Sequence, residues 1–281
     1  MEHDKLSTRS YRYSPLTRYA RNLLRKVNRG IDEFKLLSDG DRVCVAVSGG
    51  KDSLSLLHLL IEHRRFYNVK YELEAAHVVS DYAPRALETK EYIRELCASL
   101  GIPCAFPEIS VTTNEKGEPE NPTCFWCAWK RREALFSHCA ENGLNKLALG
   151  HHADDVAETT LLNLIYHGNL ETMLPRREFF DGKFTLIRPL FYVRERDLVR
   201  FARLAGFQTA SCECPNSETS KRRRMKEIIR ELSKESRLLH LMQQWIERAL
   251  AQLEVALAPV TQVLDHLVAV HRLTIEQPQD E

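Results

Sequence analysis

The chain is predicted to fold as an α/β domain with a doubly wound, mostly parallel sheet, an N-terminal helix and a C-terminal helical extension. Two observations predict this class. Short β-branched apolar runs alternate with longer segments of helical period, a pattern typical of parallel sheets with helices on both faces. The length of 281 residues also suits one large domain, or one domain with a helical accessory.

The expected elements follow one another along the chain. Over residues 16–37, apolar residues recur at spacings of three and four and arginines occupy the other face, which predicts an amphipathic helix. Residues 42–47 form a β-branched run that predicts a buried strand, followed by a glycine turn and a helix. The later segments predict strands over 71–79, 104–109 and 146–149 and helices over 84–100, 129–141 and 156–166. Beyond residue 193 only helical periodicity is visible.

Charge and composition limit the possible partners. The chain has 40 Lys and Arg residues against 39 Asp and Glu residues, so a nucleic-acid site would have to be a local patch. The polar N-terminus and the lack of a long apolar run predict a cytoplasmic protein without membrane association. Eight unevenly placed cysteines in such a compartment indicate a metal or redox role rather than disulfides.

A six-residue turn follows the first predicted strand and opens a helix. Backbone N–H groups and the positive end of a helix would face one point there, which predicts an anion cradle. Its residues are Ser48, Gly49, Gly50, Lys51, Asp52 and Ser53. The glycines allow close approach, the serines and Lys51 offer donors, and Asp52 could hold magnesium. The alternative is an ordinary strand-to-helix turn, and neither the Walker A nor the GxGxxG spacing is present.

A second polar turn, Gly150-His151-His152-Ala153-Asp154-Asp155, follows the strand predicted over 146–149. Loops at the carboxyl ends of parallel strands share one crevice, so the two turns are expected to meet over one ligand. The alternative is that Asp154 or Asp155 only caps the following helix.

The cysteines fall into two kinds. Cys124 and Cys127 form a CxxC at the end of a polar loop over residues 112–123, and Cys212 and Cys214 form a later group. A lone CxxC fits zinc, a redox pair or coincidence, whereas a second group favours a metal, and iron–sulfur ligation accepts irregular spacing. The remaining cysteines are expected to be small buried hydrophobic residues: Cys44, Cys97, Cys104 and Cys139.

The SGGKDS turn resembles the PP-loop of the ATP-pyrophosphatase superfamily, whose members have an adenine-nucleotide α-hydrolase-like sheet and cleave ATP between the α- and β-phosphates. The resemblance implies that Ser48 to Ser53 cradle the phosphates, that Lys51 stabilises the leaving group and that Asp52 positions Mg²⁺. It implies catalytic roles for Lys51, Asp52 and Asp155. It also places further residues at the nucleotide: Ala46, Val47, His77, Val79, Gly150 and Asp155.

Taken with the CxxC, the segment 187–190 (IRPL) and a late cysteine followed by arginines, residues 16–232 are similar to the tRNA 2-thiocytidine synthetase family. The resemblance implies thiolation of a tRNA cytidine, at position 32, after adenylation of its carbonyl. It also implies a 4Fe-4S cluster held by Cys124, Cys127 and Cys212, with one iron open for sulfur. Only one residue separates Cys212 from Cys214, where the family has two, so Cys214 is the alternative third ligand. The implied partners are tRNA, a cysteine desulfurase or other sulfur donor, and a second copy in a homodimer.

Two basic segments are candidates for RNA contact. One is the arginine face of the first helix, and the other is Arg222, Arg223 and Arg224. Such runs are otherwise solvated helix faces.

The predicted organisation is an N-terminal helical segment over 1–40, a PP-loop ATP-binding domain with the inserted CxxC over 41–210, a cysteine loop with helices over 211–273 and a disordered tail over 274–281. Two other functions stay open at this point. One is a PP-loop thiolation enzyme for another nucleotide or a metabolite, and the other is a non-catalytic ATP-binding regulator with zinc or an iron–sulfur cluster.

Overall fold

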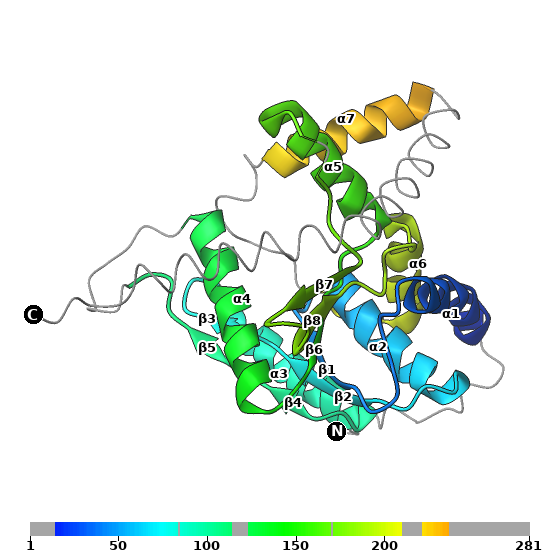
Figure 1. Ribbon diagram of the computed structural model, residues 1–281, viewed down its shortest axis with the longest axis vertical. Helices are drawn as coiled ribbons and strands as arrows, with labels where there is room; N and C mark the ends of the chain where they lie inside the picture. The colour runs from blue at the N-terminus through cyan, green and yellow to red at the C-terminus, as the bar shows by residue number, and fades with distance from the viewer. Residues whose placement is uncertain (1–14, 84, 114–122, 170, 210–220, 236–281) are drawn as a thin grey trace, which may run out of the picture. The chain divides into compact units, whose positions relative to one another are not determined.

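The computed structural model describes residues 15–83, 85–113, 123–169, 171–209 and 221–235 (Figure 1). The chain divides into two compact units, Met1–Lys226 and Glu227–Glu281, and the sheet belongs to the first of them. The predicted boundary at 210/211 and the predicted disordered tail over 274–281 lie outside the described residues, so the four-part division stays a prediction.

A six-stranded sheet with the order β4-β2-β1-β6-β8-β7 forms the centre of the first unit. Neighbouring strands are parallel in every pair except β7 and β8, which are antiparallel. The strands are β1 (Arg42–Ala46), β2 (Glu72–Ala76), β4 (Cys104–Ala105), β6 (Lys146–Ala148), β7 (Arg176–Phe179) and β8 (Phe184–Ile187). Two short strands, β3 (Val79–Ser80) and β5 (Glu108–Ile109), pair in a second parallel sheet. The predicted mostly parallel α/β fold is therefore confirmed.

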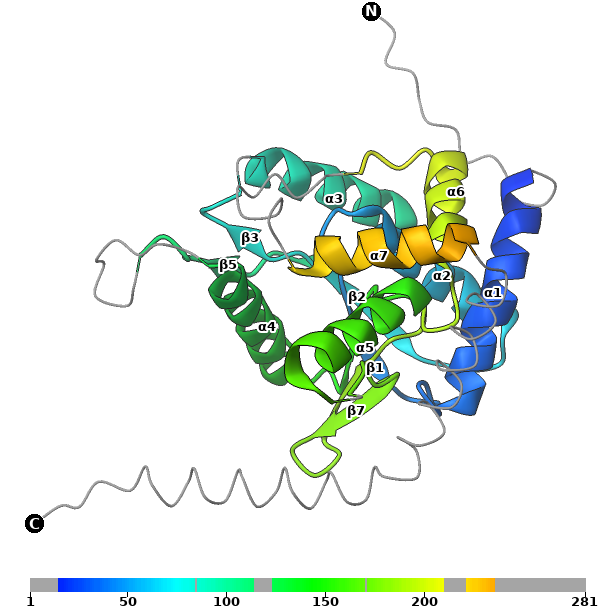
Figure 2. The same cartoon turned by 90° about the horizontal axis from the view of Figure 1, so that it is seen from above.

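Helices cover both faces of this sheet, as the doubly wound prediction requires. Figure 2 shows α1 (Pro15–Glu33), α2 (Lys51–Phe66), α3 (Ala86–Leu100) and α6 (Glu195–Ala205) on one side and α4 (Cys124–Glu141) on the other. Helix α2 contacts β1, α1 and α6 and is buried from Ser53 to His63. On the opposite face, a core cluster joins the sheet to α4: Cys44, Ala76, Leu135, Cys139, Leu144, Leu147 and Phe184.

The structure corrects three predicted boundaries. Helix α4 begins at Cys124 rather than near residue 129, because Thr123 caps it by accepting the Trp126 N–H at 3.1 Å. The CxxC therefore lies in the first helical turn and not at the end of a loop. Helix α5 (Ala153–His167) begins three residues earlier than predicted, with His152 as its N-cap. The strand predicted over 104–109 is two short strands, β4 and β5, with Pro107 between them, which has no N–H to donate.

The β7–β8 hairpin is absent from the sequence prediction. Its turn places Phe180, Asp181 and Gly182 at positive φ, and Asp-Gly is a recognised hairpin signal. The β8 segment is a run of four buried residues, too short to separate from its surroundings by periodicity. Its position beside β6 nevertheless completes the parallel part of the sheet.

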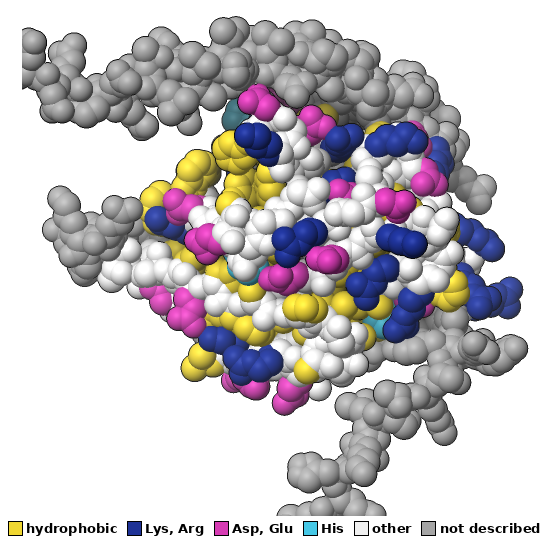
Figure 3. All heavy atoms as spheres, turned by 60° about the horizontal axis from the view of Figure 1, so that its bottom comes forward, with side chains coloured by type: hydrophobic (Ala, Val, Ile, Leu, Met, Phe, Trp, Pro, Cys, Tyr) yellow, Lys and Arg dark blue, Asp and Glu magenta, His cyan; other side chains and the backbone are white. Residues whose placement is uncertain are grey.

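The predicted cysteine burial is borne out for Cys44, Cys97 and Cys139, whereas Cys104 is half-buried. On the face shown in Figure 3, Lys and Arg side chains lie among Asp and Glu side chains. In the part of the chain that the structure describes, we find no helix whose length and apolar character would suffice for a membrane span.

Candidate active site

The turn from Ser48 to Ser53 joins β1 to α2 and is braced by its own serines. Ser53 Oγ accepts the Ser48 N–H at 3.1 Å and donates to the Gly50 carbonyl at 3.0 Å. Gly49 has a φ of +84°, a conformation that favours glycine. Gly50 is the N-cap of α2 and supplies no side-chain cap, so no side-chain oxygen there competes with a ligand for the first N–H groups. An uncapped helix start of this kind fits the phosphate groups of a nucleotide.

The second turn lies directly against the first. A Cβ atom at Gly150 would be 3.0 Å from the Ser53 backbone nitrogen and 3.1 Å from the Asp52 carbonyl carbon. Only glycine permits this approach without a shift of the backbone, since such contacts are tighter than nearly all real Cβ contacts. The two motifs, about a hundred residues apart in the sequence, therefore meet as predicted.

The acidic residues of the second turn have structural contacts of their own. Asp155 Oδ2 accepts the His152 N–H at 2.9 Å, and the Asp155 N–H donates to His152 Nδ1 at 3.3 Å, which is a capping box with histidine as the cap. Asp154 accepts from Arg194 Nε at 3.2 Å and from the Glu195 N–H at 2.7 Å. Asp155 thus caps α5, which is compatible with its predicted role at the nucleotide, while Asp154 ties the starts of α5 and α6 together.

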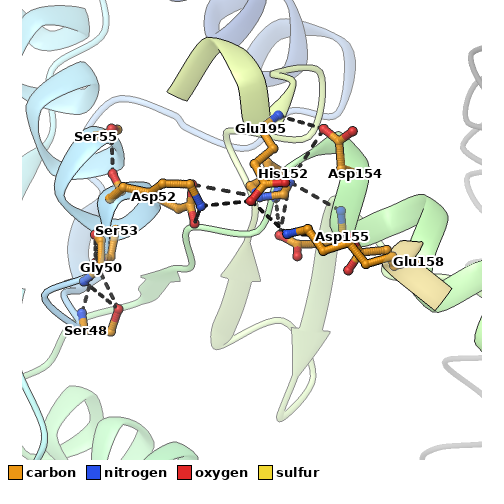
Figure 4. A network of polar contacts seen from close by, with 12 residues as sticks. Ser48, Gly50, Asp52, Ser53, Ser55, His152, Asp154, Asp155, Glu158 and Glu195 are labelled. Atoms are coloured by element: carbon orange, nitrogen blue, oxygen red, sulfur yellow. Dashed lines mark hydrogen bonds and ion pairs between the residues drawn. The ribbon is translucent and has the colours of Figure 1, made fainter. Parts of the chain in front are cut away.

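Asp52 lies between the two turns (Figure 4). Its Oδ2 accepts from Lys51 Nζ at 2.9 Å, whereas its Oδ1 is buried without a hydrogen-bond partner. An unsatisfied buried carboxylate oxygen is costly and suits a hard cation. No three His, Cys, Asp or Glu side chains among the described residues converge on one metal position. Asp52 therefore fits a magnesium ion that takes its remaining ligands from phosphate and water, as Mg²⁺ commonly does.

Lys51 is held by two carboxylates. Its Nζ lies 2.9 Å from Asp52 Oδ2 and 3.1 Å from Glu195 Oε1. Burial alone would lower the pKa of Lys51, but the two carboxylates outweigh burial and raise it. Lys51 is therefore a charged ammonium at the mouth of the turn, as a phosphate ligand needs.

Three charged residues at this site were not predicted from the sequence. Burial would raise the pKa of Glu195, but hydrogen bonds from Lys226 and Lys51 lower it to about 2. Burial raises the pKa of Glu158 to about 7, although Lys226 lies 4.0 Å away. Lys226 also donates to Glu195 Oε1 at 2.8 Å. No motif contains these residues, so only their spatial contacts reveal them.

The residues predicted beside the adenine lie at the carboxyl ends of β1 and β2. His77 is buried and its Nδ1 is 2.7 Å from the Val47 carbonyl oxygen. Burial lowers the pKa of His77, although its bond to that carbonyl opposes the shift. Ala46 ends β1 and the buried Val79 begins β3. Ala46, Val47 and His77 thus lie next to the turn, and Val79 follows at the start of β3. The contact of these four residues with adenine stays a prediction.

The CxxC approaches the same edge of the sheet from α4. Because α4 is the crossover that precedes the parallel strand β6, its N-terminal end lies at the carboxyl edge of the sheet, the edge that carries both turns (Figure 1). Cys127 is half-buried in the first turn of α4. Cys212, Cys214 and the side chain of Cys124 lie outside the described residues.

The predicted RNA contacts are described only in part. Arg222, Arg223 and Arg224 belong to the first turn of α7 (Lys221–Glu235), and Arg224 is exposed. The side chains of Arg222 and Arg223 lie outside the described residues.

Fold and site together define a PP-loop protein: a parallel α/β sheet with an SGGKDS turn at the carboxyl end of β1. In agreement, the family described as PP-loop domain matches residues 19–232. The tRNA-cytidine(32) 2-sulfurtransferase of Geobacter sulfurreducens is 43% identical over 219 residues, which cover 75% of this chain and 82% of that protein. The protein of the same name from Pelobacter propionicus is 40% identical over 222 residues, covering 76% and 80%. The chain therefore belongs to the tRNA-cytidine(32) 2-sulfurtransferase family, which confirms the resemblance seen in the sequence.

A solved structure has the same fold. The U34-tRNA thiolase NcsA from Methanococcus maripaludis, determined with its 4Fe-4S cluster, matches with a TM-score of 0.68 at 22% identity. The match covers 84% of this chain and 78% of that one.

Proposed function

We propose that this chain is an ATP-dependent tRNA sulfurtransferase that adenylates the C2 carbonyl oxygen of cytidine 32 and replaces that oxygen with sulfur. Family membership supports the substrate, since relatives at about 40% identity carry this activity in their names. One structural observation carries the chemistry. The start of α2 combines uncapped N–H groups with Lys51 and Asp52, and the backbone of the Gly150–Asp155 turn packs directly against it.

The activation step uses the groups of the phosphate loop. The cytosine O2 attacks the α-phosphorus of ATP, the bond to the β-phosphate breaks, and pyrophosphate leaves. The N–H groups at the start of α2 and the Lys51 ammonium oppose the charge that develops on the leaving phosphates. Asp52, whose Oδ1 has no hydrogen-bond partner, would hold the magnesium ion.

The second step replaces oxygen with sulfur. A nucleophilic sulfur attacks C2, the C2–O bond breaks, and AMP leaves with the former carbonyl oxygen, because adenylation has made that oxygen a good leaving group. A 4Fe-4S cluster held by Cys124, Cys127 and Cys212 would supply the sulfur in nucleophilic form. Cys127 fits this role, since it is half-buried at a helix start on the edge of the sheet that carries the phosphate loop.

Further parts of the proposal rest on the resemblance alone. We propose a cytoplasmic homodimer that receives sulfur from a cysteine desulfurase or another donor and contacts tRNA through Arg222, Arg223 and Arg224. We also propose that the PP-loop domain spans 41–210, with the cysteine loop and helices following it.

The test combines a cellular and a purified system. Nucleosides of tRNA from cells that lack the protein should contain no 2-thiocytidine, measured by mass spectrometry, and the wild-type gene should restore it. Anaerobically purified protein should absorb broadly at roughly 400 nm. It should also release pyrophosphate from ATP only when unmodified tRNA is present. An unchanged nucleoside profile would contradict the substrate, and a colourless, zinc-containing protein would contradict the cluster.

A further inference from the structure

Glu195 joins two lysines from different helices through one carboxylate oxygen. Its Oε1 is 3.1 Å from Nζ of Lys51, which belongs to the phosphate loop, and 2.8 Å from Nζ of Lys226, which belongs to α7. About a quarter of the Glu195 side chain is exposed, so both ion pairs are only partly screened by water.

The position of Glu195 is set by its own backbone. Its N–H donates to Asp154 Oδ2 at 2.7 Å, and Arg194 holds the other oxygen of Asp154. As the first residue of α6, Glu195 also has its negative charge at the positive end of a helix. The backbone of Glu195 is therefore held in place, whereas each lysine carries its ammonium group on a flexible four-carbon chain.

A polyphosphate ligand competes with Glu195 for Lys51. If Lys51 moves from Glu195 to the phosphates, the half-buried carboxylate of Glu195 would lose one counter-ion, which is energetically costly. Lys226 already contacts the same oxygen and keeps the charge paired. The presence of Lys226 should therefore favour the release of Lys51 from Glu195 to the phosphates.

We propose that Glu195 is a positioning residue that releases Lys51 and keeps Lys226 when nucleotide binds, and so links the phosphate loop to the start of α7. This inference rests on the proposed function, because it takes ATP as the ligand of the loop. Linkage is reciprocal, so bound ATP strengthens the contact between Lys226 and Glu195 to the same degree. Since the first turn of α7 carries Arg222, Arg223 and Arg224, ATP would prepare that turn for RNA.

A double-mutant cycle on ATP affinity tests the link. Titration calorimetry with MgATP is carried out on the full-length wild type, Lys226→Met, Glu195→Gln and the double variant. Lys226→Met should weaken ATP binding about three- to fivefold, the scale of a partly exposed ion pair. In the Glu195→Gln background, the same substitution should have no further effect.

Lys26→Met is the matched control. Lys26 pairs with Asp197 of α6 at 2.6 Å and has similar exposure, but the pair does not touch Lys51. This variant should bind ATP as the wild type does. Equal effects of Lys26→Met and Lys226→Met, or an effect of Lys226→Met of the same size in both backgrounds, would overturn the inference, because a purely structural role predicts either result.

Hydrogen exchange gives a readout independent of affinity. MgATP should slow amide exchange over residues 221–226 in the wild type and in Lys26→Met, and leave it unchanged in Glu195→Gln and Lys226→Met. A wild type that binds no ATP would refute the proposed function together with this inference. A wild type that binds ATP and thiolates tRNA, but shows no protection of α7, refutes the link alone.

Discussion

At the residue scale, the site is defined by charged side chains that are partly buried. Asp52 Oδ1 has no hydrogen-bond partner and lies 3.9 Å from His152 Nε2. Lys51 is held between two carboxylates, and burial raises the pKa of the Glu158 carboxyl to about 7. Each of these arrangements costs stability or restrains a side chain, as is usual where a protein binds a charged ligand.

Asp52→Asn tests the magnesium role. The substitution keeps the shape of the side chain but removes the charge that a hard cation needs, so tRNA-dependent pyrophosphate release should fall at least about 100-fold. Titration of Mg²⁺ should show a higher requirement, while the free energy of unfolding changes by less than about 1 kcal/mol. The control is Asp32→Asn on α1, where the carboxylate accepts from Asn28. Equal rates in the two variants would contradict magnesium binding by Asp52.

Glu158 makes stability depend on pH. Burial raises its folded pKa to about 7 from an ordinary value of 4.5, so its contribution is fully present below 4.5 and is lost as pH rises through 7. The loss should be on the order of 2 kcal/mol. Glu158→Gln, which cannot ionise, should flatten this part of the profile and be more stable than the wild type at pH 8. Urea unfolding of the ligand-free protein at several pH values measures this.

The exposed Glu141 at the end of α4 supplies the control for that series. Glu141→Gln should leave the wild-type slope between pH 5 and pH 8 unchanged. If Glu158→Gln has the same slope as the wild type, the proposed burial effect is wrong.

At the scale of elements, the site exists because two strand-to-helix turns pack backbone against backbone. Gly150 has no side chain, so the loop before α5 directly approaches the backbone at the start of α2. The start of α4 places its two cysteines one helical turn apart at the same edge of the sheet. The strand ends and helix starts thus set the positions of the site residues, and the side chains of these residues carry the charge of the site.

Gly150→Ala should push these turns apart. The new Cβ would meet backbone atoms at 3.0 to 3.1 Å, so the expected cost is about 1–3 kcal/mol of stability together with weaker ATP binding. Gly30→Ala is the matched control, because a Cβ in α1 would lie at least 3.7 Å from its neighbours and should stabilise the helix by about 0.5–1 kcal/mol. Thermal unfolding and ATP titration report the two effects, and unaltered ATP binding in Gly150→Ala would argue against a shared site.

At the scale of the whole molecule, charge is nearly balanced, so RNA recognition depends on where basic groups are placed. The formal net charge is +1, and the face in Figure 3 mixes both signs. Long-range attraction by the protein as a whole is therefore weak, and binding of tRNA requires a local group of arginines.

Reversal of Arg222, Arg223 and Arg224 to Glu should weaken tRNA binding. It should also reduce the magnitude of the negative slope of log K against log salt by about two to three. Fluorescence anisotropy at several salt concentrations measures both quantities. The control reverses the exposed Lys35 and Lys70, which lie before β1 and β2, at the amino edge of the sheet. A slope equal to that of the control would show that this turn does not contact phosphates.

Long elements and short local motifs were predictable from the sequence. Apolar period and glycine placement indicated α1, β1, α2 and the phosphate loop, because these features depend on neighbours within a few residues. The start of α4 was missed because the Thr123 cap was not recognised. The β7–β8 hairpin was missed because its strands have only four residues each.

The sequence by itself determined the family, the parallel fold and the two turns that meet at one edge of the sheet, because each is encoded in contiguous residues of defined chemistry. Only the tertiary structure brought Glu195, Lys226 and Glu158 to that site and left Asp52 Oδ1 without a hydrogen-bond partner. The reason is physical. A local pattern specifies which backbone a segment adopts, whereas a charge pair between Lys51 and Glu195 depends on how α2 and α6 pack, and no local pattern records that packing.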